Sequence, residues 1–111
     1  MQAVKILPLR GPLTGRVSLP YSKSVSNRQL LLGLHTGRPF AIEGIASGED
    51  TRYLLQAIRG LGYALYRRGA RCEIIPPSGF PAEAAIFLGE GGTTLRFALP
   101  WLAHLPLESW V

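Results

Sequence analysis

The side chains best suited to chemistry stand at the start of an apolar segment, in the run SKSVSNR at residues 22–28. A serine before an apolar run is typical of a helix start, where free backbone N–H groups and the helix dipole favour an anion. The serine hydroxyls add donors, Lys23 adds a positive charge, and Arg28 lies about one turn further along the same side. The run therefore predicts a phosphate site. Plain helix capping beside two solvated basic side chains is the alternative.

A second run of this kind, GEGGTTLR, occupies residues 89–96. Its glycines let the backbone approach a ligand closely, and its threonines can cap the helix that follows. The run matches neither the P-loop pattern nor the glycine pattern of dinucleotide-binding proteins. Because both runs join hydroxyl groups to an arginine at a helix start, each could hold one end of a polyanionic ligand.

A third helix start, SGEDTR at residues 47–52, carries acidic and basic groups together. In the simplest interpretation Asp50 is the N-cap of the helix. In the functional interpretation Asp50 or Arg52 faces the same pocket as the first two runs and orients Lys23. Both interpretations stay open from the sequence.

The other reactive residue types favour structural roles. His35 and His104 stand near predicted helix ends, where a solvated or capping role suits them. Cys72, the one cysteine of the chain, lies in a predicted strand and is interpreted as structural. A single cysteine excludes an internal disulfide framework and a Cys-based metal cluster, and the sequence has no Ser-His-Asp pattern and no metal-ligand spacing. We therefore expect no metal and no cofactor.

Hydrophobic periodicity and turn residues place these runs among short strands and helices, which predicts the α/β (α+β) class. The first helix starts at Ser22-Lys23-Ser24, which precedes the run VSNRQLLLGLH, and stops at Gly37. The other predicted elements are strands at 3–9, 14–20 and 39–45, a helix from Asp50 to Gly62, a hairpin of 63–68 and 71–75, a strand at 84–88, a helix to about His104 that Pro100 kinks or ends early, and a strand in the final LESWV.

The predicted order β-α-β-α-β-β then begins again, and residue types repeat with it. A shift of 68 positions places Arg28 on Arg96. Chance similarity between short apolar helices is the alternative to a true repeat. A true repeat gives a unit of about 70 residues and leaves the second copy unfinished. The same shift pairs Ser26 with Thr94, Leu31 with Leu99, Leu34 with Leu102 and Ile42 with Trp110.

Composition limits the class of protein. The 111 residues are 47% hydrophobic, which excludes a disordered tail, and no apolar run approaches the ~18 residues of a membrane-spanning helix. The first residues do not resemble a signal peptide, and the single cysteine suits a reducing cytoplasm. A total of 12 Lys and Arg against 7 Asp and Glu gives a net charge of +5, which attracts anions. Nucleic acid, a membrane surface and small phosphorylated or carboxylated substrates all fit that charge.

Four segments resemble signatures of one enzyme family, in the same order and with the same spacing. LPYSKSVSNRQLLL at 19–32 resembles the N-terminal signature of the 5-enolpyruvylshikimate-3-phosphate synthases, LPGSKS-x-SNR before a leucine-rich helix. FLGEGGTTLR at 87–96 is similar to their LGNAGTxxR loop. EDTR at 49–52 and RCEII at 71–75 also resemble family segments. The resemblance covers nearly the whole chain.

The resemblance implies a transferase of the shikimate pathway of aromatic amino-acid biosynthesis. Its members move the enolpyruvyl group of phosphoenolpyruvate onto the 5-hydroxyl of 3-phosphoshikimate and release phosphate. They bind both substrates between two domains built of β-α-β-α-β-β repeats, of which this chain would hold the first repeat and the start of a second. Residues 1–20 would be strands of the missing C-terminal domain, and residues 21–111 would be an incomplete N-terminal domain.

The resemblance also implies roles for residues at matching positions. Lys23 would contact both substrates, and Lys23 and Asp50 would be the catalytic residues. The substrate-binding residues would be Lys23, Ser24 and Arg28 for 3-phosphoshikimate, and Lys23, Gly92, Thr93 and Arg96 for phosphoenolpyruvate.

Two residues depart from the family pattern. Tyr21 replaces a glycine and crowds a place where the family keeps backbone. Glu90 replaces an asparagine, so either its carboxylate points away from the bound anion or the affinity for phosphoenolpyruvate suffers. Family enzymes are also several times longer, so we expect this chain alone to be inactive and to associate with itself or with the missing portion.

Two other functions compete with this one. The related UDP-N-acetylglucosamine enolpyruvyl transferases have a Lys-Asn pair where this chain has Lys23-Ser24, which argues against them. A non-catalytic anion- or RNA-binding module fits the +5 charge and the fold relationship to RNA-phosphate cyclases. The expected partners are nevertheless the two small anionic substrates, with neither nucleic acid nor membrane.

Overall fold

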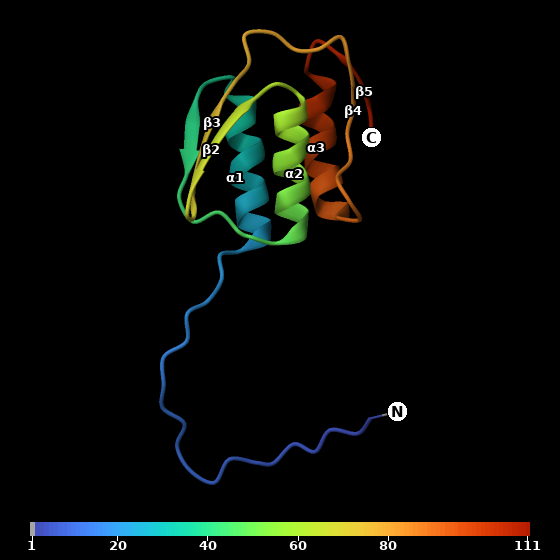
Figure 1. The fold of residues 1–111 in the computed structure, drawn as a ribbon. Coiled ribbons are helices and arrows are strands. Elements are labelled where there is room, and N and C mark those ends of the chain that lie inside the picture. The colour runs from blue at the N-terminus through green and yellow to red at the C-terminus, as the bar shows by residue number, and fades with distance from the viewer. Residues whose placement is uncertain (1) are drawn as a thin grey trace.

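The computed structural model describes residues 2–111, and its folded part is a layer of three helices flanked by strands (Figure 1). Residues 2–21 extend away from this layer and form neither helix nor strand. The strands predicted at 3–9 and 14–20 are therefore not formed. No strand within the described chain pairs with this segment, so its backbone has no ladder, and the side chains of Val17 and Leu19 are 81% and 84% exposed.

Helix α1 spans Lys23–His35 and begins where the serine predicts. The Ser22 Oγ accepts a hydrogen bond from the Val25 N–H over 3.3 Å, which satisfies one free donor of the first turn. The chain leaves the helix through Thr36 and then Gly37, whose φ of 66° is a left-handed conformation that glycine adopts without strain. The predicted start and stop of this helix are confirmed.

Helix α2 spans Glu49–Gly60, so it begins earlier than an N-cap at Asp50 would allow. Gly48 is the N-cap, with extended backbone at φ −67° and ψ 164°. The prediction of Asp50 as N-cap is wrong. Asp50 instead lies inside the first turn beside Glu49, where a carboxylate still interacts favourably with the helix dipole.

Strands β1 (Phe40–Ile42), β2 (Ala64–Arg68) and β3 (Arg71–Ile75) form an antiparallel sheet of order β1-β3-β2. The predicted hairpin is confirmed, and β2 turns into β3 through Gly69 at φ 60°. Alternate residues of β3 are buried, so one face of the sheet packs on the helices while the other faces solvent.

Strands β4 (Glu83–Ala85) and β5 (Glu108–Trp110) pair in parallel, and helix α3 (Gly92–Ala103) connects them in the chain. The strand predicted at 84–88 stops early because the β5 partner ends at Trp110, which is paired with Ala85. Helix α3 continues through Pro100 and ends at the predicted place, so the proline does not shorten it.

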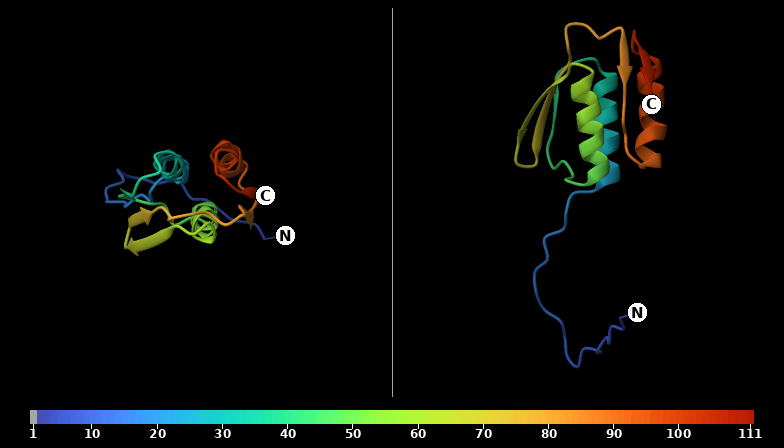
Figure 2. Two further views of the ribbon diagram at one scale, coloured as in Figure 1. Left: turned by 90° about the horizontal axis from the view of Figure 1, so that it is seen from above. Right: turned by 45° about the vertical axis from the view of Figure 1, so that its right-hand side comes forward.

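The three helices run in the same direction, and α1 contacts both α2 and α3; the three-stranded sheet lies on one side of them and the β4–β5 pair on the other (Figure 2). All three begin at the end of the layer where residues 2–21 leave it. This mixture of helices and strands confirms the predicted α/β class. No helix within residues 2–111 is long and apolar enough to cross a membrane. The core includes Leu30, Leu34, Leu54, Ile58, Leu61, Ile74, Trp101 and Leu102, all buried.

Candidate anion-binding site at the helix N-termini

The side chain of Asn27 joins all three helix starts inside the protein. Its Oδ1 accepts a hydrogen bond from the Thr51 hydroxyl of α2 over 3.0 Å. Its Nδ2 donates to the Thr94 Oγ1 of α3 over 2.9 Å. All three side chains are buried, at 1% exposure or less. The first turns of α1, α2 and α3 are therefore held in one place by a paired polar network as well as by the apolar core.

Ser26, the neighbour of Asn27 in α1, fixes the loop that leads into α2. Its Oγ accepts a hydrogen bond from the Ala46 N–H over 2.8 Å, and the side chain is 1% exposed. The Ile45 N–H donates to the Ala70 carbonyl over 2.9 Å, which holds the same loop to the hairpin. These two hydrogen bonds fix the loop that leads into α2 and so place α2 beside α1.

Lys23 and Asp50 form an ion pair at this junction. The Lys23 Nζ lies 3.0 Å from the Asp50 Oδ2, and the two side chains are 53% and 25% exposed. The functional interpretation of Asp50 in the sequence required this contact. An ion pair this exposed stabilises a fold by only about 0–1 kcal/mol, so its main physical effect is to orient the ammonium group.

Gly91 lies against the junction at the start of α3. A Cβ atom at this position would lie 2.9 Å from the Asp50 Oδ2 and 3.1 Å from the Thr94 Oγ1. Gly91 is also the N-cap of α3, and it offers no side-chain hydrogen bond to the free N–H groups of that helix. A side chain here would displace the carboxylate that holds Lys23.

The charges around the three starts differ. The first turns of α1 and α3 contain no acidic residue, whereas that of α2 contains Glu49 and Asp50. Free N–H groups and the positive dipole ends of α1 and α3 are therefore open to an anion. The Asp50 carboxylate, which could oppose an anion, is paired with Lys23. The junction can accordingly bind phosphate or carboxylate groups.

Arg28 extends the basic surface toward α3. Its guanidinium carbon lies 5.2 Å from the centroid of the Phe97 ring, a cation–π contact between α1 and α3. Ser24, half-buried in the first turn of α1, lies between Lys23 and Arg28 in the chain. The fold thus presents three of the predicted site residues along one helix start.

The predicted residues of the glycine loop lie at the start of α3. Gly92 is the first residue of the helix, and a Cβ there would meet nothing within 4 Å. Thr93 and Arg96 are exposed, as is Glu90 just before the helix. All of them share the end of the layer that holds the Lys23–Asp50 pair.

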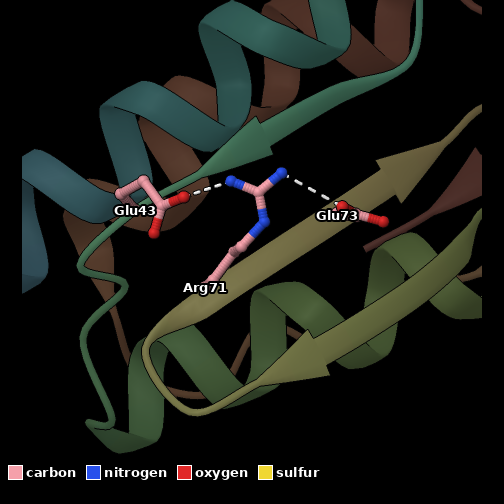
Figure 3. Close-up of polar contacts among 3 residues, drawn as sticks. All are labelled: Glu43, Arg71 and Glu73. Carbon is pink, nitrogen blue, oxygen red and sulfur yellow. Dashed lines mark hydrogen bonds and ion pairs between the residues drawn. The ribbon is translucent and has the colours of Figure 1, made fainter.

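A second basic surface, on the outer face of the three-stranded sheet, is already neutralised at its centre. Arg71 donates hydrogen bonds to Glu43 and, over 3.0 Å, to Glu73, so its guanidinium lies between two carboxylates (Figure 3). Arg67 donates to the Gly69 carbonyl over 3.3 Å. The helix junction is therefore the better candidate for an anion.

The remaining reactive residues lie away from the junction. His35 and His104 meet edge to face at 6.4 Å between ring centroids, at the opposite ends of their helices. Burial raises the pKa of the Cys72 thiol, which disfavours a reactive thiolate. Within residues 2–111 no group of three or more His, Cys, Asp or Glu side chains could hold a metal ion.

The buried residues of the junction were missed by reasoning from the sequence. Asn27, Thr51 and Thr94 stand on the inward faces of their helices, where the apolar period leads one to expect hydrophobic residues. A polar residue at such a position is the signal that could have found them, because a buried amide or hydroxyl must be paired.

A comparison with known families identifies the chain. The family model described as EPSP synthase (3-phosphoshikimate 1-carboxyvinyltransferase) matches residues 9–111. The chain belongs to the EPSP synthase family. The match includes all three helix starts and the Lys23–Asp50 pair. The resemblance seen in the sequence is therefore confirmed.

Individual relatives agree with the family match. A 3-phosphoshikimate 1-carboxyvinyltransferase of Rhizobium etli is 40% identical over 95 residues, which cover 83% of this chain and 22% of the relative. A protein of the same name from Escherichia coli is 39% identical over 114 residues, which cover 98% of this chain and 26% of the relative. The chain thus spans about a quarter of the length of these EPSP synthases.

Proposed function

We propose that this chain is the N-terminal part of an enzyme with the activity that its relatives' names state. The whole enzyme would transfer the enolpyruvyl group of phosphoenolpyruvate to 3-phosphoshikimate. In net terms the 5-hydroxyl oxygen bonds to the carbon that carries the phosphate, the carbon–oxygen bond to phosphate breaks, and the released phosphate takes up the hydroxyl proton. The observation that carries the proposal is the Lys23–Asp50 ion pair at the meeting point of three helix starts.

Lys23 and Asp50 are the proposed catalytic residues. The two substrates are polyanions that repel each other, so a fixed positive charge between them lowers the free energy of bringing them together. The Lys23 ammonium is half exposed and would donate hydrogen bonds to both substrates, while the Asp50 carboxylate at 3.0 Å keeps it oriented. The same charge stabilises the negative charge that develops as phosphate leaves.

The proposed ligands of 3-phosphoshikimate are Lys23, Ser24 and Arg28, all on α1. A phosphate at this helix start would accept hydrogen bonds from free backbone N–H groups and from the Ser24 hydroxyl. Arg28 would donate to it through two N–H groups at once, a geometry that suits a phosphate. The absence of acidic residues from the first turn of α1 supports this assignment.

The proposed ligands of phosphoenolpyruvate are Gly92, Thr93 and Arg96, together with Lys23. Open space around Gly92 lets its backbone N–H approach an anion closely. Glu90, exposed beside this loop, would weaken the affinity for phosphoenolpyruvate if its carboxylate turned toward the ligand.

The domain organisation is part of the proposal. Residues 1–20 would be strands of the C-terminal domain and residues 21–111 an incomplete N-terminal domain, and the chain as a whole would hold the first β-α-β-α-β-β repeat and the start of the second. Element bounds support the repeat: a shift of 68 positions carries α1 onto 91–103, where α3 spans Gly92–Ala103, and β1 onto β5, Glu108–Trp110.

Two properties of the isolated chain follow from this organisation. With one wall of the cleft, the chain should release no phosphate from the two substrates beyond the rate of a Lys23→Ala variant. It should also associate, with itself or with the rest of the enzyme, because Phe87, Trp110 and Val111 leave apolar surface exposed. A phosphate-release assay and light scattering measure the two properties. We further propose that the enzyme works in the cytoplasm without a cofactor.

Calorimetric titration of the chain with 3-phosphoshikimate tests the proposal. Arg28→Ala should weaken binding by roughly 1.5–3 kcal/mol, the scale of a charge-assisted hydrogen bond. Arg38→Ala is the matched control, because it removes the same charge beyond the other end of α1. Equal losses in the two variants would indicate only a general charge effect. Saturable binding supports the enzyme, whereas steeply salt-dependent binding of a polynucleotide in its place would overturn the proposal.

A further inference from the structure

The buried trio of Asn27, Thr51 and Thr94 has no part in the proposed binding of substrate. Interior polar groups destabilise a fold unless each is paired. In this trio both ends of the Asn27 amide are used, one by each threonine. Apolar side chains of similar size would hold three helices together without that requirement, but they specify a single register less strictly. The trio therefore points to a need for fixed geometry at the helix starts.

The trio lies directly beside the residues proposed to bind and react. Asn27 is next to Arg28 in α1, and Thr51 is next to Asp50 in the first turn of α2. A change in the angle or register of either helix start would move the Arg28 guanidinium or the Asp50 carboxylate.

The hydrogen bond to α3 is the shorter of the two that the Asn27 amide makes, at 2.9 Å against 3.0 Å. The Thr94 Oγ1 that accepts from Asn27 would also lie 3.1 Å from a Cβ at Gly91, and the Asp50 Oδ2 would lie 2.9 Å from the same point. The Asp50 carboxylate and the Thr94 hydroxyl therefore both lie against Gly91, and the Asn27 amide is linked to this point through its hydrogen bond to Thr94. A displacement of Thr94 would therefore alter the position of Asp50 in the Lys23–Asp50 ion pair.

We propose that Asn27 is a positioning residue that, through Thr51 and Thr94, fixes the helix starts at the separation that substrate binding requires. The inference rests on the proposed function, because the ligand whose binding depends on Asn27 is 3-phosphoshikimate. Asn27 contributes no hydrogen bond to the ligand. It holds the Asp50 carboxylate and the α3 loop where Lys23 and Arg28 can act, and an error of about 1 Å in such a site can reduce binding or turnover many-fold.

Thr94→Val is the sharpest test, because valine keeps the shape of threonine and removes the acceptor of the Asn27 Nδ2. Thr94→Ser keeps that oxygen and is the conservative variant. Thr94 lies on α3, whereas the proposed ligands of 3-phosphoshikimate, Lys23, Ser24 and Arg28, lie on α1. A loss of affinity for this ligand in Thr94→Val must therefore reach α1 from α3, and Thr94 is bonded to α1 through the Asn27 amide.

The experiment is calorimetric titration of the full chain with 3-phosphoshikimate, at a temperature where circular dichroism shows every variant to be folded. Thr94→Val should bind about tenfold more weakly, and Thr94→Ser should bind like the wild type. Thr51→Val, which removes the donor at the other end of the amide, should behave like Thr94→Val and replaces it if that variant does not fold. Ile58→Val, a change in the fully buried core of α2, should lower the melting temperature without changing Kd.

Each other outcome counts against a defined claim. If Thr94→Val melts at a lower temperature but binds like the wild type, the trio serves folding alone and the inference is overturned. The same holds if Thr94→Ser does not restore binding. If the wild-type chain binds no 3-phosphoshikimate, the assignment of Lys23, Ser24 and Arg28 as its binding residues fails and the inference falls with it. This result can be told apart from the first outcome, in which both the wild type and Thr94→Val bind 3-phosphoshikimate.

Discussion

At the end of the layer where α1, α2 and α3 begin, the interior holds an amide and two hydroxyl groups, and the surface above them carries the Lys23–Asp50 pair. At the opposite end, Tyr63 packs edge to face on Trp101, with ring centroids 6.1 Å apart, and the rim is formed by His35 and His104. The same three helices therefore have a polar end and an aromatic end.

The difference follows from the helix backbone. N-terminal ends present free N–H donors and partial positive charge, which favour anionic ligands, so binding groups gather there. C-terminal ends have no such use in this protein, and large aromatic side chains bury apolar area and stabilise the fold instead. We expect substitutions at the polar end to alter binding and substitutions at the aromatic end to alter stability.

The largest expected effect is the loss of stability in Trp101→Ala. Trp101 is 2% exposed, and removing a buried aromatic side chain lowers the free energy of unfolding by about 3–5 kcal/mol. The folded fraction should still bind 3-phosphoshikimate with wild-type affinity, because the anion site lies at the other end of the helices. Urea denaturation and calorimetry measure the two quantities. A parallel loss of affinity would show that the two ends are coupled.

The next effect is the loss of binding in Lys23→Ala. Removing the ammonium should weaken binding of 3-phosphoshikimate by roughly 1.5–3 kcal/mol, whereas the melting temperature should barely move because exposed ion pairs contribute at most about 1 kcal/mol. Lys5→Ala, which removes the only other lysine from the exposed N-terminal segment, is the control for net charge. If Lys23→Ala melts many degrees lower and binds normally, Lys23 is structural and the contrast between the ends is lost.

A smaller effect is expected for Gly91→Ala. The new Cβ would lie 2.9 Å from the Asp50 Oδ2, so the carboxylate must move away from Lys23. Overpacking of this kind typically destabilises by about 1 kcal/mol or somewhat more, and affinity for 3-phosphoshikimate should fall by a similar amount. Gly60→Ala is the control, since a Cβ there would meet nothing within 4 Å. Unchanged binding in Gly91→Ala would show that the Asp50 carboxylate need not be held where it is.

Local sequence signals predicted the elements that depend on short-range chemistry. The serine before α1, the glycine between β2 and β3 and the residues around His104 mark real boundaries, because caps and turns are satisfied within a few residues. The same reasoning failed for residues 3–9 and 14–20, since a strand also requires a partner and none of the described residues supplies one. It also misplaced the cap of α2, because Gly48 and Asp50 both suit a helix start.

The site was predictable in its charged residues and not in its geometry. Lys23, Asp50 and Arg28 stand at helix starts, where the sequence alone indicates anion binding. Nothing local shows that Asn27 would reach across to Thr94, which is 67 positions away. Such contacts depend on how the helices pack, and only the assembled fold brings the two side chains together.

The smallest expected effect is a pH dependence of stability that arises at the aromatic end. Burial raises the pKa of the Tyr63 phenol above its usual value of 10.0. Because the pKa is higher in the folded state than in the unfolded state, the folded protein holds this proton more tightly. The stabilising contribution is complete below about pH 10 and is lost as the pH rises through the folded-state pKa. The free energy of unfolding should therefore fall on the alkaline side.

Tyr63→Phe isolates this contribution, because phenylalanine keeps the ring and removes the ionisable group. Urea denaturation at a series of pH values from 7 upward should give a shallower alkaline decline in Tyr63→Phe than in the wild type. Part of the decline should remain, since burial also raises the pKa of the Cys72 thiol above its usual 9.0 and acts with the same sign. Tyr66→Phe, at a side chain that is 59% exposed, is the control for the removal of a phenol hydroxyl. If the free energy of unfolding of Tyr63→Phe declines as steeply with pH as that of the wild type, water reaches the aromatic end in solution. The two ends of the helices would then differ less in burial than the packing implies.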